Sequence, residues 1–345
     1  MIRAATPDDP LRILALGAGV QSSYLYLASC IGELPRLDAA IFADTRYEPK
    51  GVYDHLAWLE TMGEQHGIPI IWAGVGDLRQ DALDFRQDRV SRDGKRWASV
   101  PFYVKNKNGK RGQIRRQCTA TYKIEPMERV IREQLLGLRR GQRAPRVAVV
   151  EQWIGISFDE NQRCSHPGVF RTKKVVVGND MFGYPIEDVE KTWHPLRWKT
   201  HTYPLCCRRF KADRTTEDVD YLRYPMNRMG CEIWLKRFFP DRKIPRSACI
   251  GCPYRSNAEW RKMRDEDPAS WADAVQFDRD IRRRDLAGQQ KRQLSVGVPY
   301  IHDTLIPLDM VNLDEDDGKT GAGCGIVYDK GGMQEGGLFS GLCGR

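Results

Sequence analysis

Residues 11–23, LRILALGAGVQSS, join a short apolar run to a turn of small residues and then to the start of a helical pattern. The apolar run predicts a buried strand that ends at Leu16, and Tyr24 and Leu25 continue the helical pattern. Glycines in such a turn let the backbone approach a ligand closely, and the first N–H groups of a helix attract an anion. We therefore expect a phosphate-binding turn formed by Gly17, Ala18, Gly19, Gln21, Ser22 and Ser23.

Three further apolar runs, at residues 37–44, 68–73 and 147–156, alternate with helical patterns. Strands that alternate with helices predict an α/β fold with a doubly wound, mostly parallel, Rossmann-like sheet. Ligands of such sheets bind at the carboxyl ends of the strands. The turn at 17–23 and the turn at 44–48 are therefore expected side by side.

The remaining segments predict helices, insertions and a tail. A helix is expected from Pro126 to Leu136, and a charged amphipathic helix from Trp260 to Asp285. We expect a nucleotide-binding α/β domain at 1–163 with a basic insertion at 86–116, a second insertion at 164–202, a cysteine-rich helical region at 203–313 that completes the site, and a flexible tail at 314–345. Ten of the last 28 residues are glycine, too many for a packed element.

The composition is that of a globular protein, with 41% hydrophobic and 29% charged residues. No apolar run approaches the ~20 residues of a membrane span, and the amino-terminal stretch MIRAATPDDP has no signal-like apolar core. We therefore expect a cytoplasmic protein with no membrane partner. Because that compartment is reducing, the ten cysteines favour metal-binding or catalytic thiols over disulfides. The sequence does not indicate an oligomeric state.

Positive charge is concentrated in the segment 86–116, which holds eleven Lys and Arg against two Asp in a chain of net charge +9. Trp97, Phe102 and Tyr103 lie within the same segment. Basic residues interleaved with aromatic rings suit single-stranded RNA or DNA, because the cations bind phosphates and the rings stack on bases. The alternative is a basic loop that serves only a small anionic nucleotide.

The cysteines provide the strongest chemical signal. Cys249 and Cys252 form a C-x-x-C turn, which brings two thiolates to one ion, and Gly251 permits that turn. Cys118 and Cys231 raise the set to four. Four thiolates suit a [4Fe–4S] cluster first and structural zinc second, with a thioredoxin-like redox pair as a third interpretation. The vicinal pair Cys206 and Cys207 is an alternative to Cys231.

Several of these motifs occur in the order typical of one known family. The 17–23 turn, with its Gln21, resembles the PP-loop of the adenine nucleotide alpha-hydrolase superfamily, in the branch of phosphoadenosine phosphosulfate (PAPS) reductases. Asp44-Thr45 and Glu48-Pro49 resemble its "DTG…PET" segment. Trp153 to Arg163 resembles its "W..G.R..[ED]S..R" segment, with Gly155 and Arg163 in place but Ser157 instead of the first arginine.

The resemblance implies a PP-loop (HUP-type) fold that binds ATP or a PAPS-type adenine nucleotide through the turn, Asp44, Thr45, Gly155 and Arg163. Members that cleave ATP usually have Asp where this chain has Gln21, so a Mg²⁺ ion would need Asp44 or Glu48. Adenylyl-sulfate reductases combine an upstream cysteine with a late C-x-x-C to hold a [4Fe–4S] cluster. Thiolating relatives often use three cysteines.

Cys343, in Leu342-Cys343-Gly344, resembles the nucleophilic cysteine on the carboxyl-terminal tail of PAPS reductases, although an inert tail cysteine is the alternative. The expected catalytic residues are Cys343, Cys118 and Asp44. The favoured hypothesis is a nucleotide-dependent sulfur-transfer enzyme that acts on nucleic acid with an iron–sulfur cluster and a sulfur donor or reductant protein. The alternatives are a PAPS or adenylyl-sulfate reductase and a non-catalytic nucleotide- or nucleic-acid-binding module.

Overall fold

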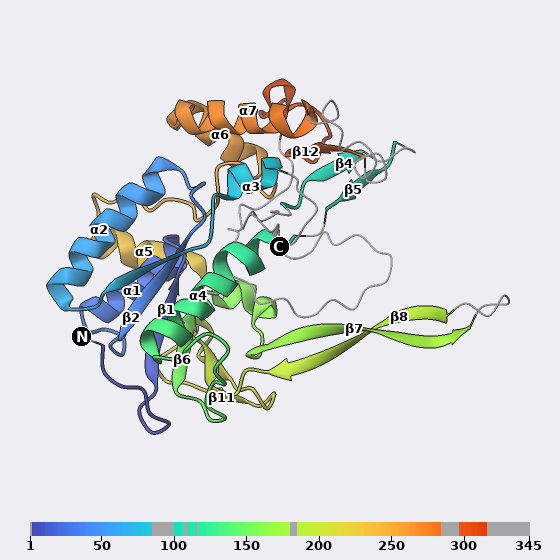
Figure 1. Ribbon diagram of the computed structural model, residues 1–345. Helices are drawn as coiled ribbons and strands as arrows, with labels where there is room; N and C mark the ends of the chain where they lie inside the picture. Colours follow the sequence, from blue (N-terminus) through green and yellow to red (C-terminus); the bar gives the residue numbers. More distant parts are fainter. Residues whose placement is uncertain are drawn as a thin grey trace.

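The computed structural model describes residues 2–84, 100–105, 109–114, 116–179, 185–283 and 297–315. At its centre lies a seven-stranded sheet with the order β11-β10-β9-β6-β1-β2-β3 (Figure 1). Its strands are β1 (Leu11–Leu16), β2 (Ala39–Asp44), β3 (Ile70–Gly74), β6 (Val150–Ile154), β9 (Lys199–Tyr203), β10 (Arg208–Phe210) and β11 (Thr216–Asp218). The strands from β3 to β9 run parallel, and β10 and β11 are antiparallel additions at one edge.

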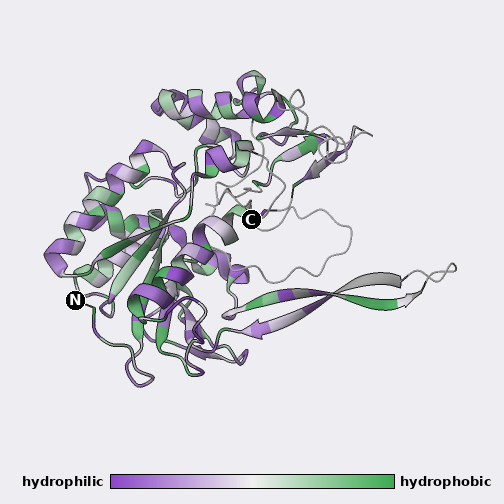
Figure 2. Ribbon diagram, viewed as in Figure 1, coloured by the Kyte–Doolittle hydropathy of each residue, from purple (hydrophilic) through white to green (hydrophobic). Residues whose placement is uncertain are grey.

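Alternate residues of the central strands face opposite sides of the sheet, and helices cover both sides. Leu14 of β1 and Phe42 of β2 pack with α1 (Val20–Cys30), α2 (Lys50–His66) and α5 (Arg228–Phe238). On the other side, Ile13 and Ile41 pack with the helical run that contains α4 (Glu125–Arg129). Figure 2 shows hydrophobic colouring along the central strands and mixed colouring on the covering helices. The expectation of an α/β fold with a mostly parallel sheet is therefore confirmed.

The sheet continues past residue 163, where the nucleotide-binding domain was expected to end. Strand β9 pairs with β6, and β10 and β11 extend the same sheet. The region 203–313 is therefore not only helical, because its first part completes the central sheet. The helix expected from Pro126 to Leu136 is present as α4 with π-helical turns at Ala120–Ile124 and Val130–Leu135.

The expected insertion at 164–202 contains a long antiparallel hairpin, β7 (Gly168–Asn179) and β8 (Pro185–Pro195). The hairpin projects away from the body of the molecule (Figure 1). After the hairpin the chain returns to the sheet as β9. Just before the two strands β6 and β9 begin to pair, Val149 N donates to Trp198 O at 2.8 Å. The insertion therefore ends inside the core.

A second group of elements packs beyond the carboxyl edge of the sheet (Figure 1). It comprises α3 (Leu78–Asp84), α6 (Asn257–Glu266), α7 (Pro268–Arg283) and a small sheet of β4 (Tyr103–Lys105), β5 (Arg111–Gln113) and β12 (Val298–Tyr300). The single helix expected from Trp260 to Asp285 is wrong. Pro268 begins a new helix, because a proline disfavours helical conformation in the residue before it, and Asp267 has φ −138° and ψ 69°.

Some expectations lie outside the described residues. Residues 85–99, 106–108 and 115 hold most of the basic segment, and residues 316–345 hold nearly all of the tail, including Cys343.

Candidate functional site

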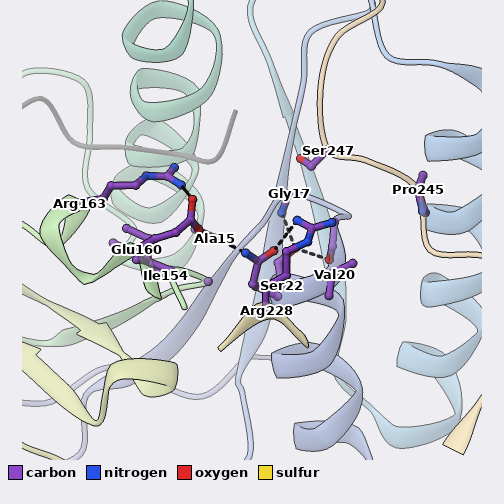
Figure 3. A pocket seen from close by; sticks show the side chains of 14 residues that line it. Ala15, Gly17, Val20, Ser22, Ile154, Glu160, Arg163, Arg228, Pro245 and Ser247 are labelled. Carbon is purple, nitrogen blue, oxygen red and sulfur yellow. Dashed lines mark hydrogen bonds and ion pairs between the residues drawn. The ribbon is translucent and has the colours of Figure 1, made fainter. Parts of the chain in front are cut away.

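A pocket of about 60 Å³ opens at the carboxyl ends of β1 and β6 (Figure 3). The chain runs from β1 to β2 and β3 on one side and places β6 and β9 on the other, so the strand order reverses between β1 and β6. Such a switch point is where open α/β sheets bind ligands. We call this cavity the nucleotide pocket, after the ligand that the sequence leads us to expect at its glycine turn. Its lining is Ala15, Gly17, Gly19, Val20, Gln21, Ser22, Ile154, Gly155, Ile156, Glu160, Arg163, Arg228, Pro245 and Ser247.

The glycine turn is held by the first turn of α1. Gly17 N donates to Ser22 Oγ at 3.2 Å, and that hydroxyl donates to Gly19 O at 3.2 Å. A Cβ on Gly17 would lie 2.9 Å from Ser247 Oγ, and a Cβ on Gly19 would lie 2.9 Å from Ser247 Cβ. The close approach of the segment that carries Ser247 therefore requires Gly19, whereas the contact at Gly17 is with the Ser247 hydroxyl, which can rotate.

Gly155 plays a similar part on the neighbouring strand. A Cβ on Gly155 would lie 3.1 Å from Ser22 N at the amino end of α1. The end of β6 therefore passes directly against the helix end whose N–H groups attract an anion. Gly155 therefore lines the same pocket as the glycine turn.

Two arginines supply positive charge to the nucleotide pocket. Arg163 is 6% exposed, and its guanidinium pairs with Glu160, while its Nε and Nη2 are buried without a hydrogen-bond partner. Arg228, the first residue of α5, donates to Gln21 Oε1 at 3.5 Å, and Gln21 Nε2 donates to Glu160 Oε2 at 3.3 Å. Buried donors without partners are rare in folded proteins, so those of Arg163 favour an anionic ligand.

Three residues expected in this site point elsewhere. Ala18 is buried in the core beside α1 and has φ +56°. Ser23 Oγ lies 2.8 Å from His55 Nε2 and so joins α1 to α2. Asp44 Oδ1 accepts from Arg46 N at 2.8 Å and from Tyr53 Oη at 2.9 Å, and Asp44 does not line the nucleotide pocket.

A second cavity, of about 30 Å³, is lined by three cysteines. We call it the cysteine pocket; its lining is Thr45, Tyr47, Leu78, Val100, Pro101, Cys118, Thr119, Lys123, Cys249, Gly251, Cys252, Pro253 and Phe277. Thr45 therefore belongs to this cavity. A Cβ on Gly251 would lie 2.6 Å from Phe277, which explains the glycine between the two cysteines of the C-x-x-C turn.

Charged side chains are buried around the three thiols. Glu48 Oε1 accepts from Thr45 Oγ1 at 3.0 Å, from Lys123 Nζ at 3.4 Å and from Cys249 Sγ at 3.4 Å. Arg255 is 4% exposed and donates to the carbonyls of Ala248 and Cys249. Burial, and then the negative charge of Glu48, raises the pKa of the Cys249 thiol. The thiol is therefore protonated at neutral pH unless a cation binds to it.

Cys118, Cys249 and Cys252 fit a thiolate-bound metal or cluster by their chemistry. They line one cavity, and Lys123 and Arg255 provide buried positive charge beside it. Within the described ranges, no three His, Cys, Asp or Glu side chains already converge as a finished metal site. Binding would therefore draw these thiols together and release their protons.

Cys231 does not join this set, and its assignment as the fourth ligand is corrected. It is 0% exposed in α5 and packs in the core on the α1 side of the sheet. Burial raises its pKa to about 12. The alternative pair is also elsewhere: Cys206 Sγ lies 3.9 Å from Cys164 Sγ, and Cys207 Sγ donates to Leu222 O at 3.7 Å.

One segment joins the two pockets. Pro245 and Ser247 line the nucleotide pocket, whereas Cys249 and Cys252 line the cysteine pocket. Ile250 N donates to the carbonyl of Tyr47 at 2.8 Å, which fixes this segment against the loop after β2. The segment from Pro245 to Pro253 is the bridging segment of the site.

Sequence reasoning did not assign Arg228, Ser247 and Arg255 to the site, and it left Glu160 inside a motif without a role. The signal for Glu160 was its position in the segment that ends at Arg163. No local pattern marks Arg228 or Ser247, because each reaches the pocket from a distant part of the chain.

Searches against protein-family models, curated proteins and solved structures gave no match. No helix in the described ranges is long and apolar enough to cross a membrane.

Proposed function

We propose that this chain is an adenine-nucleotide-dependent sulfur-transfer enzyme of the PAPS reductase-like PP-loop family, acting on nucleic acid with a cysteine-held iron–sulfur cluster. One observation carries the proposal: the glycine turn and three cysteines from distant segments form two cavities joined by the bridging segment. A nucleotide site beside a thiol site suits a reaction in which one activates the acceptor and the other supplies sulfur.

In the nucleotide pocket, the amino end of α1 and Arg163 bind the phosphates of ATP. Arg228 adds a second positive charge on the opposite rim (Figure 3). Glu160 supplies the carboxylate that Gln21 does not, so it is the residue that would hold a Mg²⁺ ion beside the phosphates. An acceptor oxygen then attacks the α-phosphorus, pyrophosphate leaves, and the acceptor becomes adenylated.

In the cysteine pocket, Cys118, Cys249 and Cys252 are the residues that would hold the cluster. When bound, the cluster provides a place to carry the sulfur that displaces AMP from the adenylated acceptor. Lys123 and Arg255 balance the negative charge of thiolates in a buried site. The apolar lining, which includes Val100 and Phe277, keeps water away from the thiols.

A second candidate, reduction of PAPS or adenylyl sulfate, is favoured by Gln21, which occupies the pocket where an ATP-cleaving enzyme usually has Asp. In that case the Cys343 thiolate attacks the sulfonyl sulfur, the S–O bond to the nucleotide phosphate breaks, and the nucleotide leaves. A dithiol carrier then reduces the S-sulfocysteine, releases sulfite, restores the Cys343 thiol and becomes a disulfide. This candidate needs no nucleic acid.

The test is anaerobic purification followed by iron, sulfide and zinc analysis and by assays with ATP plus RNA or DNA, and with PAPS. Pyrophosphate release that depends on nucleic acid, from a protein with about four irons per chain, supports the proposal. Sulfite from PAPS without nucleic acid supports reduction. Cys118→Ala is expected to lose iron, whereas Cys231→Ala, the matched control in the core, is expected to keep it. Equal iron in both variants would contradict the proposed cysteine site.

A further inference from the structure

A buried carboxylate outside the lining of the cysteine pocket contacts one of the pocket's thiols. Glu48 is 5% exposed, its Oε1 lies 3.4 Å from Cys249 Sγ, and its Oε2 is buried without a hydrogen-bond partner. Cys249 Sγ donates a hydrogen bond to Glu48 Oε1, so the thiol proton lies between the two atoms. A metal ion that replaced this proton would be bound by both groups.

The distance between the two groups suits shared coordination. A zinc–sulfur bond of about 2.3 Å and a zinc–oxygen bond of about 2.1 Å at the tetrahedral angle put the two ligand atoms about 3.6 Å apart. Glu48 Oε1 and Cys249 Sγ are separated by nearly this distance. The pair is therefore spaced like two ligands of one tetrahedral metal.

The backbone holds Glu48 in this place independently of a metal. It follows β2 in the loop that begins with Thr45, whose hydroxyl donates to Glu48 Oε1 at 3.0 Å. The carbonyl of Tyr47 accepts from Ile250 N at 2.8 Å, so the loop is tied to the C-x-x-C turn itself. A ligand on this loop therefore moves together with Cys249 and Cys252.

We propose that Glu48 is the fourth protein ligand of the metal centre, which is held by Cys118, Cys249, Cys252 and Glu48. The inference rests on the metal site in the proposed function and replaces the fourth cysteine that the sequence predicted. The fourth position is then a carboxylate, bound either to zinc or to the one cluster iron that lacks a thiolate. Carboxylate is a weaker ligand than thiolate for these metals, so this position is the one that a substrate sulfur can displace.

The competing explanation is that Glu48 only pairs with Lys123 and never touches a metal. The two ideas differ in coordination number, which cobalt(II) reports when it binds in place of zinc. Thiolate-to-cobalt absorption counts the cysteines, and the d–d bands report whether the ion is four-coordinate. Cobalt and zinc affinity can both be measured by competition with a chelator.

The decisive variants are Glu48→Gln, which keeps the shape and removes the charge, and Glu48→Cys, which offers a thiolate in the same place. For Glu48→Gln we expect unchanged thiolate absorption, altered d–d bands, and zinc affinity lower by at least about 100-fold. This loss exceeds the roughly 10- to 100-fold typical of a residue that only supports a ligand. For Glu48→Cys we expect retained affinity and stronger thiolate absorption. ATP binding to the nucleotide pocket checks that each variant is folded.

The same variants are also tested with iron. Each is reconstituted anaerobically with iron and sulfide, and its iron content and absorption spectrum are then measured. A lower iron content in Glu48→Gln than in the wild type, and its recovery in Glu48→Cys, assigns Glu48 to the cluster. Wild-type d–d bands in the cobalt form of Glu48→Gln would overturn the inference and leave the three cysteines intact. A wild-type protein that binds neither zinc, cobalt nor iron would instead remove the metal site from the proposed function.

Discussion

The two pockets are assembled in opposite ways. The nucleotide pocket lies at the ends of two adjacent central strands, and its glycine turn is continuous in sequence with β1 and α1. The cysteine pocket is formed by six segments that are far apart in the chain, at residues 45–47, 78, 100–101, 118–123, 249–253 and 277. The central sheet therefore fixes the first pocket, whereas the second depends on how loops pack beyond the sheet.

The two pockets carry a similar balance of charge. In the nucleotide pocket, Arg163 and Arg228 exceed the single carboxylate of Glu160, which favours an anionic ligand. At the cysteine pocket, Lys123 and Arg255 likewise exceed the carboxylate of Glu48, but the raised pKa of the Cys249 thiol keeps that group protonated. An anion could therefore bind at the glycine turn without a change of protonation, whereas a metal ion at the cysteines would have to displace thiol protons.

The largest loss of stability is expected when the ion pair between Arg163 and Glu160 is broken. Arg163→Ala leaves the Glu160 carboxylate buried without its ion partner, which costs about 3–5 kcal/mol of unfolding free energy. The same variant is expected to weaken ATP binding by roughly 10- to 100-fold, since charge-assisted hydrogen bonds contribute about 1.5–3 kcal/mol. Urea unfolding and calorimetric titration with ATP measure the two effects.

The control is the double variant Arg163→Ala with Glu160→Gln, which removes the uncompensated charge. It is expected to recover most of the stability but not the ATP affinity. Metal content is expected to stay at the wild-type level in both variants, because neither residue lines the cysteine pocket. Wild-type ATP affinity in the double variant would refute the role of Arg163 as a phosphate ligand.

Acid is expected to destabilise the protein by protonating His55, whose ring joins α2 to α1. Burial, and then Arg242, lowers the pKa of His55 from 6.5 to about 4, while its ring contacts Ser23 of α1. Between these two pH values the unfolded chain binds more protons, so the unfolding free energy falls as pH falls, by up to about 3 kcal/mol. Urea unfolding from pH 7 to pH 4 measures this loss.

His55→Gln is expected to flatten that pH dependence. His66→Gln, a change near the end of the same helix, is the matched control and is expected to keep the wild-type slope. Equal slopes in all three proteins would mean that another group is responsible for the acid sensitivity.

The same contrast explains how much the sequence could predict. The strand at Leu11, the glycine turn, Gly155 and Arg163 are local patterns, and the fold brings them together because parallel strands end at one edge. Cys249 and Cys252 are close by their spacing, but the choice of Cys118 over Cys231 depends on tertiary packing. No spacing rule distinguishes a cysteine in the core beside α1 from one that lines a cavity. Pro268 was a local signal, and the helix break there was predictable.

The smallest effect is expected from variants that test whether a change in the nucleotide pocket alters ligand binding in the cysteine pocket. A Cβ added at Gly17 or Gly19 would press on Ser247, and such overpacking costs about 1–3 kcal/mol. The atom that is pressed differs: it is Oγ for Gly17 and Cβ for Gly19. Ser247→Ala is therefore expected to rescue Gly17→Ala but not Gly19→Ala, whereas Ser247→Gly is expected to rescue both. ATP affinity and urea unfolding measure each combination.

Because Ser247 lies two residues before Cys249, pressure on it is transmitted along the bridging segment. We therefore expect Gly19→Ala to weaken zinc or iron binding as well as ATP binding, and Ser247→Gly to restore both together. If metal affinity stays at the wild-type level while ATP affinity falls, the link between Tyr47 and Ile250 is strong enough to isolate the C-x-x-C turn. The two pockets would then share a segment without affecting each other's ligand affinity. In the proposed reaction, coupling between ATP binding and sulfur transfer would have to pass through the substrate.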